Sequence, residues 1–367
     1  MKAPRFTPLV ASLPSMVPFV GPETQERATG RKFDARLGAN ENVFGPSPKA
    51  VAAMQAALHD IWMYGDPENY DLKQALAAHH GVAPENIVVG AGIDGLLGSL
   101  CRMLVQEGVS VVTSHGAYPT FNFHVAGYGG TLHTVPYVND AEDPQSLLAK
   151  AREVDATLVY IANPDNPMGS WHSAERIQAM IDDLPDTAVL CLDEAYLEFA
   201  PEGTAPALDT SKVNVIRMRT FSKAYGMAGA RVGYAIGHPE LISAFNKVRN
   251  HFGMNRAAQA GALAALQDQD YLAQTQANVA AAKERLAAIA RANGLTPLPS
   301  ATNFVTMDCG RDGDFARALV AALVERGIFV RMPFVAPQDR CIRVSAGRSQ
   351  DLDAFEAALP AALESIR

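Results

Sequence analysis

Short apolar runs alternate with helix-like segments along the middle of the chain, beginning near residue 86. Gly, Asn, Asp or Ser bounds most of these runs, and several contain enough β-branched residues to be fully buried strands. The predicted strands are 87–89, 109–113, 158–162, 189–192, 215–218 and 232–236. Segments such as 173–184, with apolar residues on one helical face behind the N-cap Ser173, lie between them. This alternation predicts a mostly parallel sheet covered by helices on both faces.

The pattern changes after about residue 250. Residues 255–293 are alanine-rich and predict a helical region that ends at Gly294. We then expect a strand at 303–307, a helix from 316 to Gly327, strands near 328–331 and 341–345, and a final helix. This order predicts a smaller α+β domain beside the sheet, and the cleft between two domains is a common ligand site.

The first forty or so residues predict an irregular arm interrupted by prolines, and helical signals begin at Ser47 and Pro48. Lys2 and Arg5 precede a partly apolar stretch, as in a signal peptide, but prolines break the apolar helix that such a segment needs. Because no run of about 18 apolar residues exists, we expect no transmembrane helix and a cytoplasmic protein. The expected parts are an arm with part of the small domain at 1–46, a large domain at 47–250 and a small domain at 251–367.

Composition argues against several classes of protein. The length of 367 residues favours two domains over one. The chain has 31 basic and 39 acidic residues, a formal net charge of −8, which argues against nucleic acid or an anionic membrane as the main partner. Its hydrophobic share of 48% is typical of globular proteins. The four cysteines contain no C-x-x-C pair and the nine histidines no H-E-x-x-H motif, so no metal site is predicted.

Lys223 lies in the segment with the strongest chemical signal. It follows a predicted strand, Thr220 and Ser222 place hydroxyl groups beside it, and Arg231 comes shortly afterwards. A lysine whose pKa is lowered by its surroundings is a nucleophilic amine suited to carbonyl chemistry. The segment fits a Schiff-base lysine whose neighbours bind a phosphate, and on its own it fits a solvated loop lysine equally well.

Two further polar segments follow predicted strands, at the sheet edge where ligands bind in open α/β folds. Asp193 ends one strand and can pair with the ring nitrogen of a pyridoxal cofactor, with Tyr196 close behind it. Asn166 lies in an Asn-Pro segment after another strand, where its amide can face the cofactor's ring oxygen. Taken singly, a helix cap is the simpler interpretation of Asp193, and Asn-Pro pairs are ordinary turn formers.

A glycine-rich turn lies between the predicted strand 87–89 and a helix. Such a turn directs free backbone N–H groups and the positive end of the helix dipole toward an anion. Gly90, Gly92 and Gly95 also spell G-x-G-x-x-G, the dinucleotide-binding fingerprint. No acidic residue clearly ends a second strand about 20 positions later, which argues against a dinucleotide site.

Further short motifs occur in order along nearly the whole chain. They are Leu37-Gly38-Ala39-Asn40-Glu41-Asn42 with Gly45-Pro46-Ser47, Tyr64 with Asp66-Pro67, Tyr118 before Pro119-Thr120, Asn166-Pro167 with Gly169, Asp193-Glu194-Ala195-Tyr196, Ser222-Lys223, Arg231, and Arg343 in Ile342-Arg343-Val344-Ser345. With the glycine turn, this series resembles the fold-type I pyridoxal-phosphate aminotransferases, specifically the histidinol-phosphate aminotransferase group. The resemblance implies an α/β fold with a mostly parallel sheet in a large domain that binds pyridoxal 5'-phosphate, and a smaller α+β domain.

The resemblance also implies a role for each motif residue around the cofactor. Lys223 forms the internal aldimine and, once released, carries the proton between Cα and C4′. The other implied cofactor contacts are Asp193 to the ring nitrogen, Asn166 and Tyr196 to the ring oxygen, Tyr118 stacked on the ring, and Gly92, Ile93, Asp94, Thr220, Ser222 and Arg231 at the phosphate.

The same resemblance implies the substrate side and the assembly. Arg343 grips the anionic end of the substrate with a planar fork suited to carboxylate or phosphate, and Arg331 takes the place of a second anion-binding arginine. Asn42 is expected on the substrate side as well. Tyr64 matches a tyrosine that reaches the cofactor phosphate of the neighbouring subunit, which implies a homodimer with shared active sites.

Several positions depart from the family pattern. Val43 and Gly65 replace prolines in segments that shape the substrate side. Met168 replaces a usual threonine, Asp165 a usual asparagine, and Gly95 an acidic residue in the phosphate turn. None of these changes removes a catalytic group. Because Val43 and Gly65 lie on the substrate side, these two changes bear on the substrate more than on the reaction.

The resulting hypothesis is an aminotransferase that passes an amino group from L-histidinol phosphate to 2-oxoglutarate in a ping-pong cycle. An aromatic or other amino acid is the alternative donor, because Arg343 alone suffices for its carboxylate. A decarboxylase resembling the threonine-phosphate enzyme of cobalamin synthesis uses the same scaffold, and fold does not determine function. A non-catalytic module of a DNA-binding regulator is disfavoured by the short stretch ahead of the core and the net charge of −8.

Overall fold

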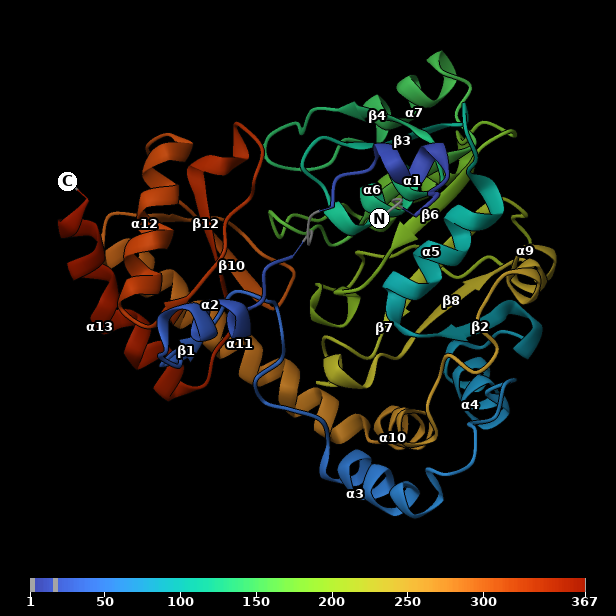
Figure 1. Cartoon of the computed structure of the whole chain (residues 1–367), viewed down its shortest axis with the longest axis horizontal. Helices are drawn as coiled ribbons and strands as arrows, with labels where there is room; N and C mark the ends of the chain where they lie inside the picture. Colours follow the sequence, from blue (N-terminus) through green and yellow to red (C-terminus); the bar gives the residue numbers. More distant parts are fainter. Residues whose placement is uncertain (1–3, 16–18, 367) are drawn as a thin grey trace.

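A seven-stranded sheet forms the centre of the larger part of the molecule (Figure 1). The computed structural model describes residues 4–15 and 19–366. The strands of this sheet are β2 (Ile87–Gly90), β3 (Ser110–Ser114), β4 (Thr131–Val135), β5 (Leu158–Ala162), β6 (Val189–Asp193), β7 (Val215–Thr220) and β8 (Gly233–Gly237). Their order is β2-β8-β7-β6-β5-β3-β4. β8 runs antiparallel to both neighbours and the other neighbouring pairs are parallel, so the predicted mostly parallel sheet is confirmed.

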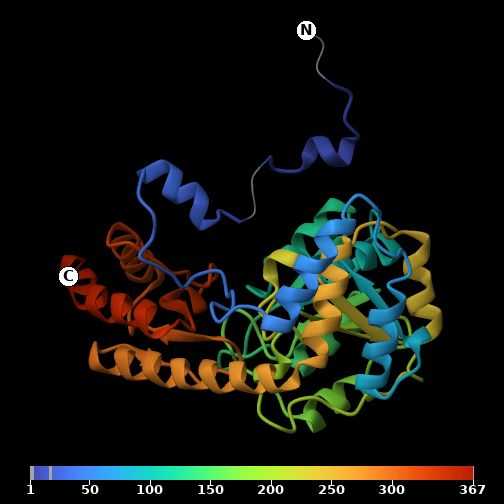
Figure 2. The same ribbon diagram turned by 90° about the horizontal axis from the view of Figure 1, so that it is seen from below.

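Helices surround this sheet (Figure 2). They are α3 (Pro48–Ala57), α4 (Tyr70–His80), α5 (Gly92–Leu104), α6 (Pro119–Gly127), α7 (Pro144–Glu153), α8 (Ala174–Asp182), α9 (Pro239–Ala244) and α10 (Arg256–Gln267). Two of them begin at the predicted caps, where Ser47 accepts a hydrogen bond from Ala50 N and Ser173 accepts one from Arg176 N. Gly81 ends α4 in the left-handed conformation that favours glycine.

Alternate residues of the central strands enter two different hydrophobic clusters. In β5, Leu158 and Tyr160 pack with residues of α5 and α6, whereas Val159 and Ile161 pack with residues of α7 and α8. Because successive side chains of a strand point to opposite faces, both faces of β5 are buried. This two-sided burial explains why the central strands are continuous apolar runs.

Within the seven-stranded sheet, β4 is the strand that the apolar pattern does not predict. Its sequence is Thr-Leu-His-Thr-Val, and only Val135 is buried. It lies at the end of the strand order, paired with β3. An edge strand has one neighbour and more contact with solvent, so its sequence need not be apolar.

The predicted helical region 255–293 consists of two helices. Asp268 interrupts it, and α11 (Gln269–Ala292) then continues to the small domain, followed by Gly294 with φ +76° as expected. Gly261 brings α10 against α3, since a Cβ there would lie 2.5 Å from Met54 Cγ. α10 and Leu272 at the start of α11 share a hydrophobic cluster with strands of the large sheet, whereas α11 from Val279 onward packs with the small unit. The large domain thus extends beyond the boundary predicted at residue 250.

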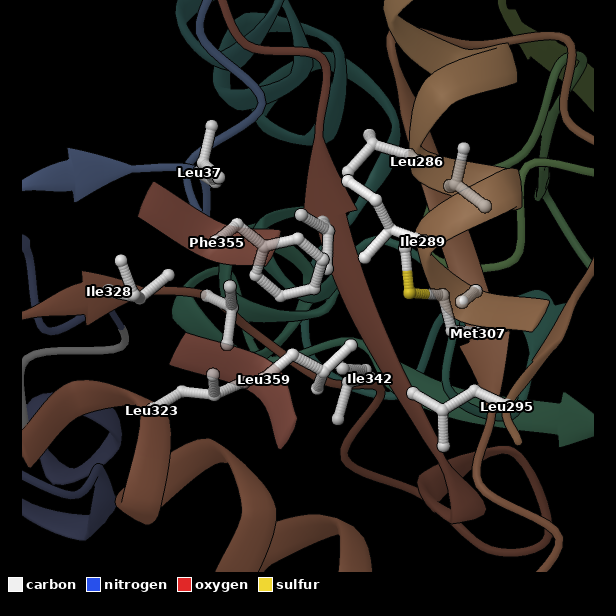
Figure 3. Packing of buried hydrophobic residues seen from close by; sticks show 14 of the residues in the cluster. Leu37, Leu286, Ile289, Leu295, Met307, Leu323, Ile328, Ile342, Phe355 and Leu359 are labelled. Atoms are coloured by element: carbon white, nitrogen blue, oxygen red, sulfur yellow. The ribbon is translucent and has the colours of Figure 1, made fainter. Parts of the chain in front are cut away.

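The smaller part of the molecule is an α+β unit, as predicted. Its elements are β1 (Ala35–Arg36), β9 (Thr296–Pro297), β10 (Phe304–Asp308), β11 (Ile328–Phe329), β12 (Cys341–Ser345), α12 (Gly313–Glu325) and α13 (Ser349–Ser365). β10 pairs in antiparallel fashion with β9 and β12, and β1 pairs in parallel with β11. Figure 3 shows the core they share, in which Ile289, Ile342 and Phe355 pack together with Leu37 from the N-terminal segment. The segment around Leu37 therefore belongs to the small unit.

The N-terminal arm lies outside the packed layers (Figure 2). It contains α1 (Pro8–Ser12) and α2 (Pro22–Thr29), each with proline at the start of the helix, where a missing N–H removes no helical hydrogen bond. Pro8 therefore begins a helix here rather than only interrupting one, and Lys2 lies outside the described residues. Over residues 4–15 and 19–366, no helix is both long and apolar enough to cross a lipid bilayer.

Candidate active site

A cavity of about 430 Å³ lies where the carboxyl ends of β5, β6 and β7 meet the N-terminus of α5 and the small unit. This volume is in the range of small-molecule sites, and the position is the usual one in open α/β sheets. The predicted site residues that line it are Ile93, Asp94, Tyr118, Asn166, Asp193, Tyr196, Thr220, Ser222, Lys223, Arg231, Arg331 and Arg343. A larger hollow of about 540 Å³ beside α4 is lined by none of these residues.

Lys223 lies in the turn that follows β7. Its Nζ donates a hydrogen bond to the backbone carbonyl of Asn40, 3.0 Å away, and lies 5.4 Å from the centre of the Tyr196 ring. Desolvation, and then the nearby Arg343 guanidinium, lower the pKa of Lys223 to about 8. A lysine with this pKa is partly deprotonated near neutral pH, as attack on an aldehyde requires.

Asp193 ends β6 with a buried carboxylate. Its Oδ2 accepts a hydrogen bond from the Tyr160 hydroxyl at 2.7 Å, and its Oδ1 accepts one from Ala195 N at 2.9 Å. Burial raises the pKa of Asp193 to about 6, although both hydrogen bonds oppose the rise. A buried carboxylate with no cation bonded to it among the described residues is a suitable partner for a protonated ring nitrogen.

Arg231 lies against the glycine turn that precedes α5. A Cβ at Gly92 would lie 2.3 Å from Arg231 Nη2, and a Cβ at Gly233 would lie 2.7 Å from Ile93 N. Both positions need glycine for this close approach. Gly92 is a predicted site residue that does not line the cavity, and its role in the structure is to make room for Arg231. The N-cap residue Ala91 makes no side-chain hydrogen bond to the first N–H groups of α5, so they are available to an anion.

Thr220 and Ser222 complete this corner of the cavity. Arg231 Nη1 donates to Ser222 Oγ at 3.3 Å, and Ser222 N donates to Thr220 Oγ1 at 3.0 Å. Thr220 Oγ1 donates in turn to Val232 O at 3.2 Å. One guanidinium, two hydroxyl groups and a free helix N-terminus together form a set of donors that suits a phosphate.

Arg343 approaches the cavity from β12 of the small unit. It donates to the side-chain oxygen of Asn166 and, at 3.2 Å, to Gly38 O. Its buried Nε has no hydrogen-bond partner among the described residues. Burial lowers the pKa of Arg343 to about 10, and the neighbouring Arg331 contributes to this decrease. The guanidinium therefore has one buried N–H donor without a partner among the described residues.

Arg331 lies beside Arg343 at the same side of the cavity. The two residues exchange backbone hydrogen bonds in both directions. Arg331 Nη2 donates to Val20 O of the arm at 3.2 Å, and its guanidinium lies 4.1 Å from the centre of the Phe19 ring. The arm thus contributes an aromatic ring to the cavity, which the sequence analysis does not predict.

Asn40 is a second residue that sequence reasoning missed. Its side-chain Nδ2 donates to the Tyr196 hydroxyl at 3.1 Å, and its Oδ1 accepts from Ser345 Oγ at 3.2 Å. With its carbonyl it also holds Lys223. Its place in the recognised segment 37–42 is the only sequence signal that points to it.

Asn42 and Tyr64 are predicted site residues that the structure leaves outside this cavity. Asn42 Nδ2 donates to Ala224 O at 3.1 Å, so its buried side chain holds the backbone next to Lys223 instead of facing the cavity. Tyr64 is 76% exposed and its ring lies 4.6 Å from that of Phe252.

Asp165, which stands where the family usually has asparagine, is buried behind Asn166. Its Oδ1 accepts from the Tyr137 hydroxyl at 2.9 Å and its Oδ2 from Met168 N at 3.0 Å. Burial raises the pKa of Asp165 to about 7. These contacts hold the turn that presents Asn166 to the cavity. Asp165, although it departs from the family pattern, therefore helps to position Asn166.

Known proteins share this fold and sequence. The family model for class I and II aminotransferases matches residues 35–359. The histidinol-phosphate aminotransferase of Roseiflexus castenholzii is 36% identical over 357 residues, covering 95% of each chain. Histidinol-phosphate aminotransferase 1 of Nitrosococcus oceani is 34% identical over 348 residues, which are 94% of this chain and 93% of that protein. The crystal structure of histidinol-phosphate aminotransferase from Sinorhizobium meliloti in complex with pyridoxal-5'-phosphate is 54% identical, with a TM-score of 0.97 over 100% of this chain and 99% of that one.

The cavity fits the cofactor of that solved structure. Asp193 offers a buried carboxylate to a ring nitrogen, Lys223 an amine to an aldehyde, and Arg231 with the N-terminus of α5 a cradle for a phosphate. The predictions of an enzyme, its family, its fold class and its cofactor are confirmed, whereas the roles of single residues stay predictions. The chain belongs to the class I and II aminotransferases, as a pyridoxal-phosphate enzyme of fold type I, and within them to the histidinol-phosphate aminotransferase group.

Proposed function

We propose that the protein transfers the amino group of L-histidinol phosphate to 2-oxoglutarate. The observation that carries this proposal is the pair of guanidinium groups, Arg331 and Arg343, in one cavity with Lys223. Among the described residues, the side-chain hydrogen bonds of both arginines go to backbone carbonyls and to the Asn166 amide rather than to carboxylates. Two guanidinium groups that are not paired with carboxylates favour a ligand with two negative charges.

Both proposed substrates meet this requirement. A phosphate monoester carries nearly two negative charges at neutral pH, and 2-oxoglutarate has a carboxylate at each end. Relatives that match the chain over nearly its full length are named for histidinol phosphate, which supports the same donor. A simple aromatic amino acid has one carboxylate and would leave one guanidinium without a counter-charge.

The proposed mechanism assigns each step to residues of the cavity. Bound pyridoxal phosphate supplies an electron sink that makes the Cα proton of an attached amine acidic. Lys223 would hold the cofactor covalently through Nζ between reactions and, once freed, would carry the proton that leaves Cα. Asp193 would keep the ring nitrogen protonated, while Asn166 and Tyr196 would bind the ring oxygen.

Tyr118 is proposed to cover the ring, and Ile93, Asp94, Thr220, Ser222 and Arg231 to surround the phosphate. Because a single cavity contains both arginines and Lys223, donor and acceptor must bind in turn. The first product then leaves before 2-oxoglutarate enters, which is a ping-pong cycle.

The donor is tested by comparing L-histidinol phosphate with L-phenylalanine, each with 2-oxoglutarate. We expect efficient turnover of the phosphate ester, and we expect Arg331→Gln to lower its kcat/KM roughly a hundredfold, because one partner of a desolvated charge pair is lost. Steady-state kinetics of the wild-type protein and the variant measure both effects.

Turnover of L-phenylalanine with negligible turnover of the phosphate ester would replace this donor by an aromatic amino acid. Release of carbon dioxide from L-threonine phosphate without an acceptor would instead favour the decarboxylase. Arg331→Gln should leave the kcat/KM for L-phenylalanine within a few-fold, since that substrate needs only Arg343.

We further propose a homodimer with shared active sites. Between residues 58 and 70 the chain has five apolar or aromatic residues that are each more than half exposed: Leu58, Ile61, Trp62, Tyr64 and Tyr70. Phe252 is exposed as well, and its ring lies 4.6 Å from that of Tyr64. Exposed apolar residues gathered in one segment are typical of an interaction surface. The segment includes Tyr64, the residue proposed to reach the cofactor phosphate of the partner, so a second copy of the chain is the occupant that fits. The cytoplasmic location stays a prediction.

Shared sites predict complementation between two impaired variants. Lys223→Ala lacks its own lysine, and Tyr64→Ala lacks the side chain that it contributes to the partner's site. Mixed under subunit exchange, they should form heterodimers in which one site has both native residues, so turnover should rise above that of either variant alone. Turnover equal to the average of the separate variants would contradict a shared site, and size-exclusion chromatography with light scattering checks that the dimer forms.

A further inference from the structure

An acidic residue lies inside the proposed phosphate corner. Asp94 is in the first turn of α5, lines the cavity, and contributes an electrostatic interaction with Arg231. In a helix without a ligand, an acidic side chain in the first turn stabilises the helix through a favourable interaction with its dipole. Beside a phosphate, the same carboxylate repels the ligand and competes with it for the guanidinium.

The Asp94 carboxylate is held by a histidine from the neighbouring helix. His124 of α6 donates a hydrogen bond from Nε2 to Asp94 Oδ1 at 2.7 Å, because a carboxylate can only accept. The side chain of His124 is 20% exposed and that of Asp94 46%. The hydrogen bond from His124 is the main reason that the pKa of Asp94 is lowered. Burial acts in the opposite direction but is the smaller effect, so the carboxylate is ionised.

The two helices are packed to allow this contact. Gly98 lies one turn after Asp94 on α5, and a Cβ at Gly98 would lie 3.0 Å from His124 Cε1. The imidazole therefore lies against the surface of α5, where a larger residue at 98 would displace it. This packing directs the Asp94 carboxylate toward α6.

We propose that His124 is a positioning residue for the cofactor: it holds the Asp94 carboxylate toward α6 and away from the phosphate corner, so that Arg231 is left to the phosphate. The inference rests on the proposed placement of the cofactor phosphate at the N-terminus of α5. It assigns the chain's own His–Asp pair to phosphate affinity and not to the chemistry at Lys223. From the sequence, Asp94 is expected only as one of the residues at the phosphate, and His124 has no expected role.

The experiment is a double-mutant cycle on cofactor binding. His124→Phe and Asp94→Asn are made singly and together, and the dissociation constant of pyridoxal phosphate is measured by equilibrium dialysis of each variant. Phenylalanine fills the space of the imidazole but has no donor for the Asp94 carboxylate, whereas glutamine would keep one. We expect His124→Phe to weaken cofactor binding about tenfold in the wild-type background, because the released Asp94 carboxylate adds repulsion near the phosphate. In the Asp94→Asn background the same change should have little effect, because no carboxylate remains to be held.

Two further measurements distinguish positioning from simple packing. Pyridoxal, which lacks the phosphate, should bind to wild-type protein and His124→Phe equally well. The ³¹P resonance of the bound cofactor should move toward the monoanion position in His124→Phe, because a nearby negative charge favours the protonated phosphate. Thermal unfolding without the cofactor checks that each variant is folded, and His124→Leu serves as a second variant if the phenylalanine variant fails to fold.

Three results would overturn the inference. The change at His124 could weaken cofactor binding equally with and without Asp94→Asn, it could weaken the binding of pyridoxal as much as that of pyridoxal phosphate, or it could leave cofactor binding unchanged. Arg231→Ala separates this failure from a failure of the proposed site. That variant should lose the preference for pyridoxal phosphate over pyridoxal whether or not His124 matters, and if it keeps the preference, the proposed placement of the phosphate is wrong.

Discussion

Replacing Lys223 by alanine should lower the rate of amino transfer roughly ten-thousandfold or more, because one group supplies both the covalent link and the proton carrier. Lys223 is the amine in the cavity whose pKa is lowered to about 8, and its Nζ is oriented by Asn40 O. No other lysine lines the cavity among the described residues, so none can take its place. Stopped-flow single-turnover measurements with L-histidinol phosphate check the rate, and the absorption band of the lysine-bound cofactor should disappear.

Lys283 provides a matched control for this variant. Burial also lowers its pKa to about 8, and its Nζ donates to Ser300 O at 2.7 Å, but it lies in α11 outside the cavity. Lys283→Ala should therefore keep the absorption band and most of the rate. An unchanged band in Lys223→Ala, or its loss in Lys283→Ala, would remove Lys223 from the mechanism.

Replacing Asp193 by asparagine should lower kcat about a hundred- to a thousandfold, the usual effect of removing one oriented electrostatic contact from a transition state. The amide is nearly isosteric with the carboxylate but has no charge to keep the ring nitrogen protonated, so negative charge at Cα is less well stabilised. Binding of the cofactor should weaken less than kcat falls, because the phosphate corner and Lys223 remain. Steady-state kinetics and dialysis measure the two effects separately.

Tyr160→Phe tests whether the orientation of Asp193 contributes. This variant removes only the hydroxyl that donates to Asp193 Oδ2 at 2.7 Å, and the buried ring still stacks on Phe121 with centres 4.4 Å apart. We expect kcat to fall about tenfold, as the loss of one hydrogen bond to a charged group implies. If Asp193→Asn were no worse than Tyr160→Phe, the charge of Asp193 would have no special role.

Local sequence predicted the elements whose signals are local. Ser47 and Ser173 cap helices because their side chains reach an N–H three residues on, and β5 is apolar because both of its faces are buried. β4 escaped prediction because an edge strand has no such requirement. The break at Asp268 also escaped it, since the alanine-rich composition on both sides favours one continuous helix.

Motif order predicts the charged and polar groups of the candidate site better than the residues that orient those groups. Asn42 carries the motif but turns its side chain to Ala224, since a motif specifies residue type and not the direction of a side chain. Tyr160 looked like an ordinary core residue of an apolar strand. Its hydroxyl gains a role only because β5 and β6 are neighbours.

By itself, the sequence determined the alternation of strands and helices, the chemical groups available, and through the order of its motifs the family of enzyme. The tertiary structure alone decided which of those groups meet. Asn40 and Lys223 are separated by 183 positions, and Asp94 and His124 by 30, yet each pair is joined by a hydrogen bond. Such contacts depend on how whole elements pack, with distances set to tenths of an ångström by residues such as Gly92 and Gly98, and no local pattern along the chain records that geometry.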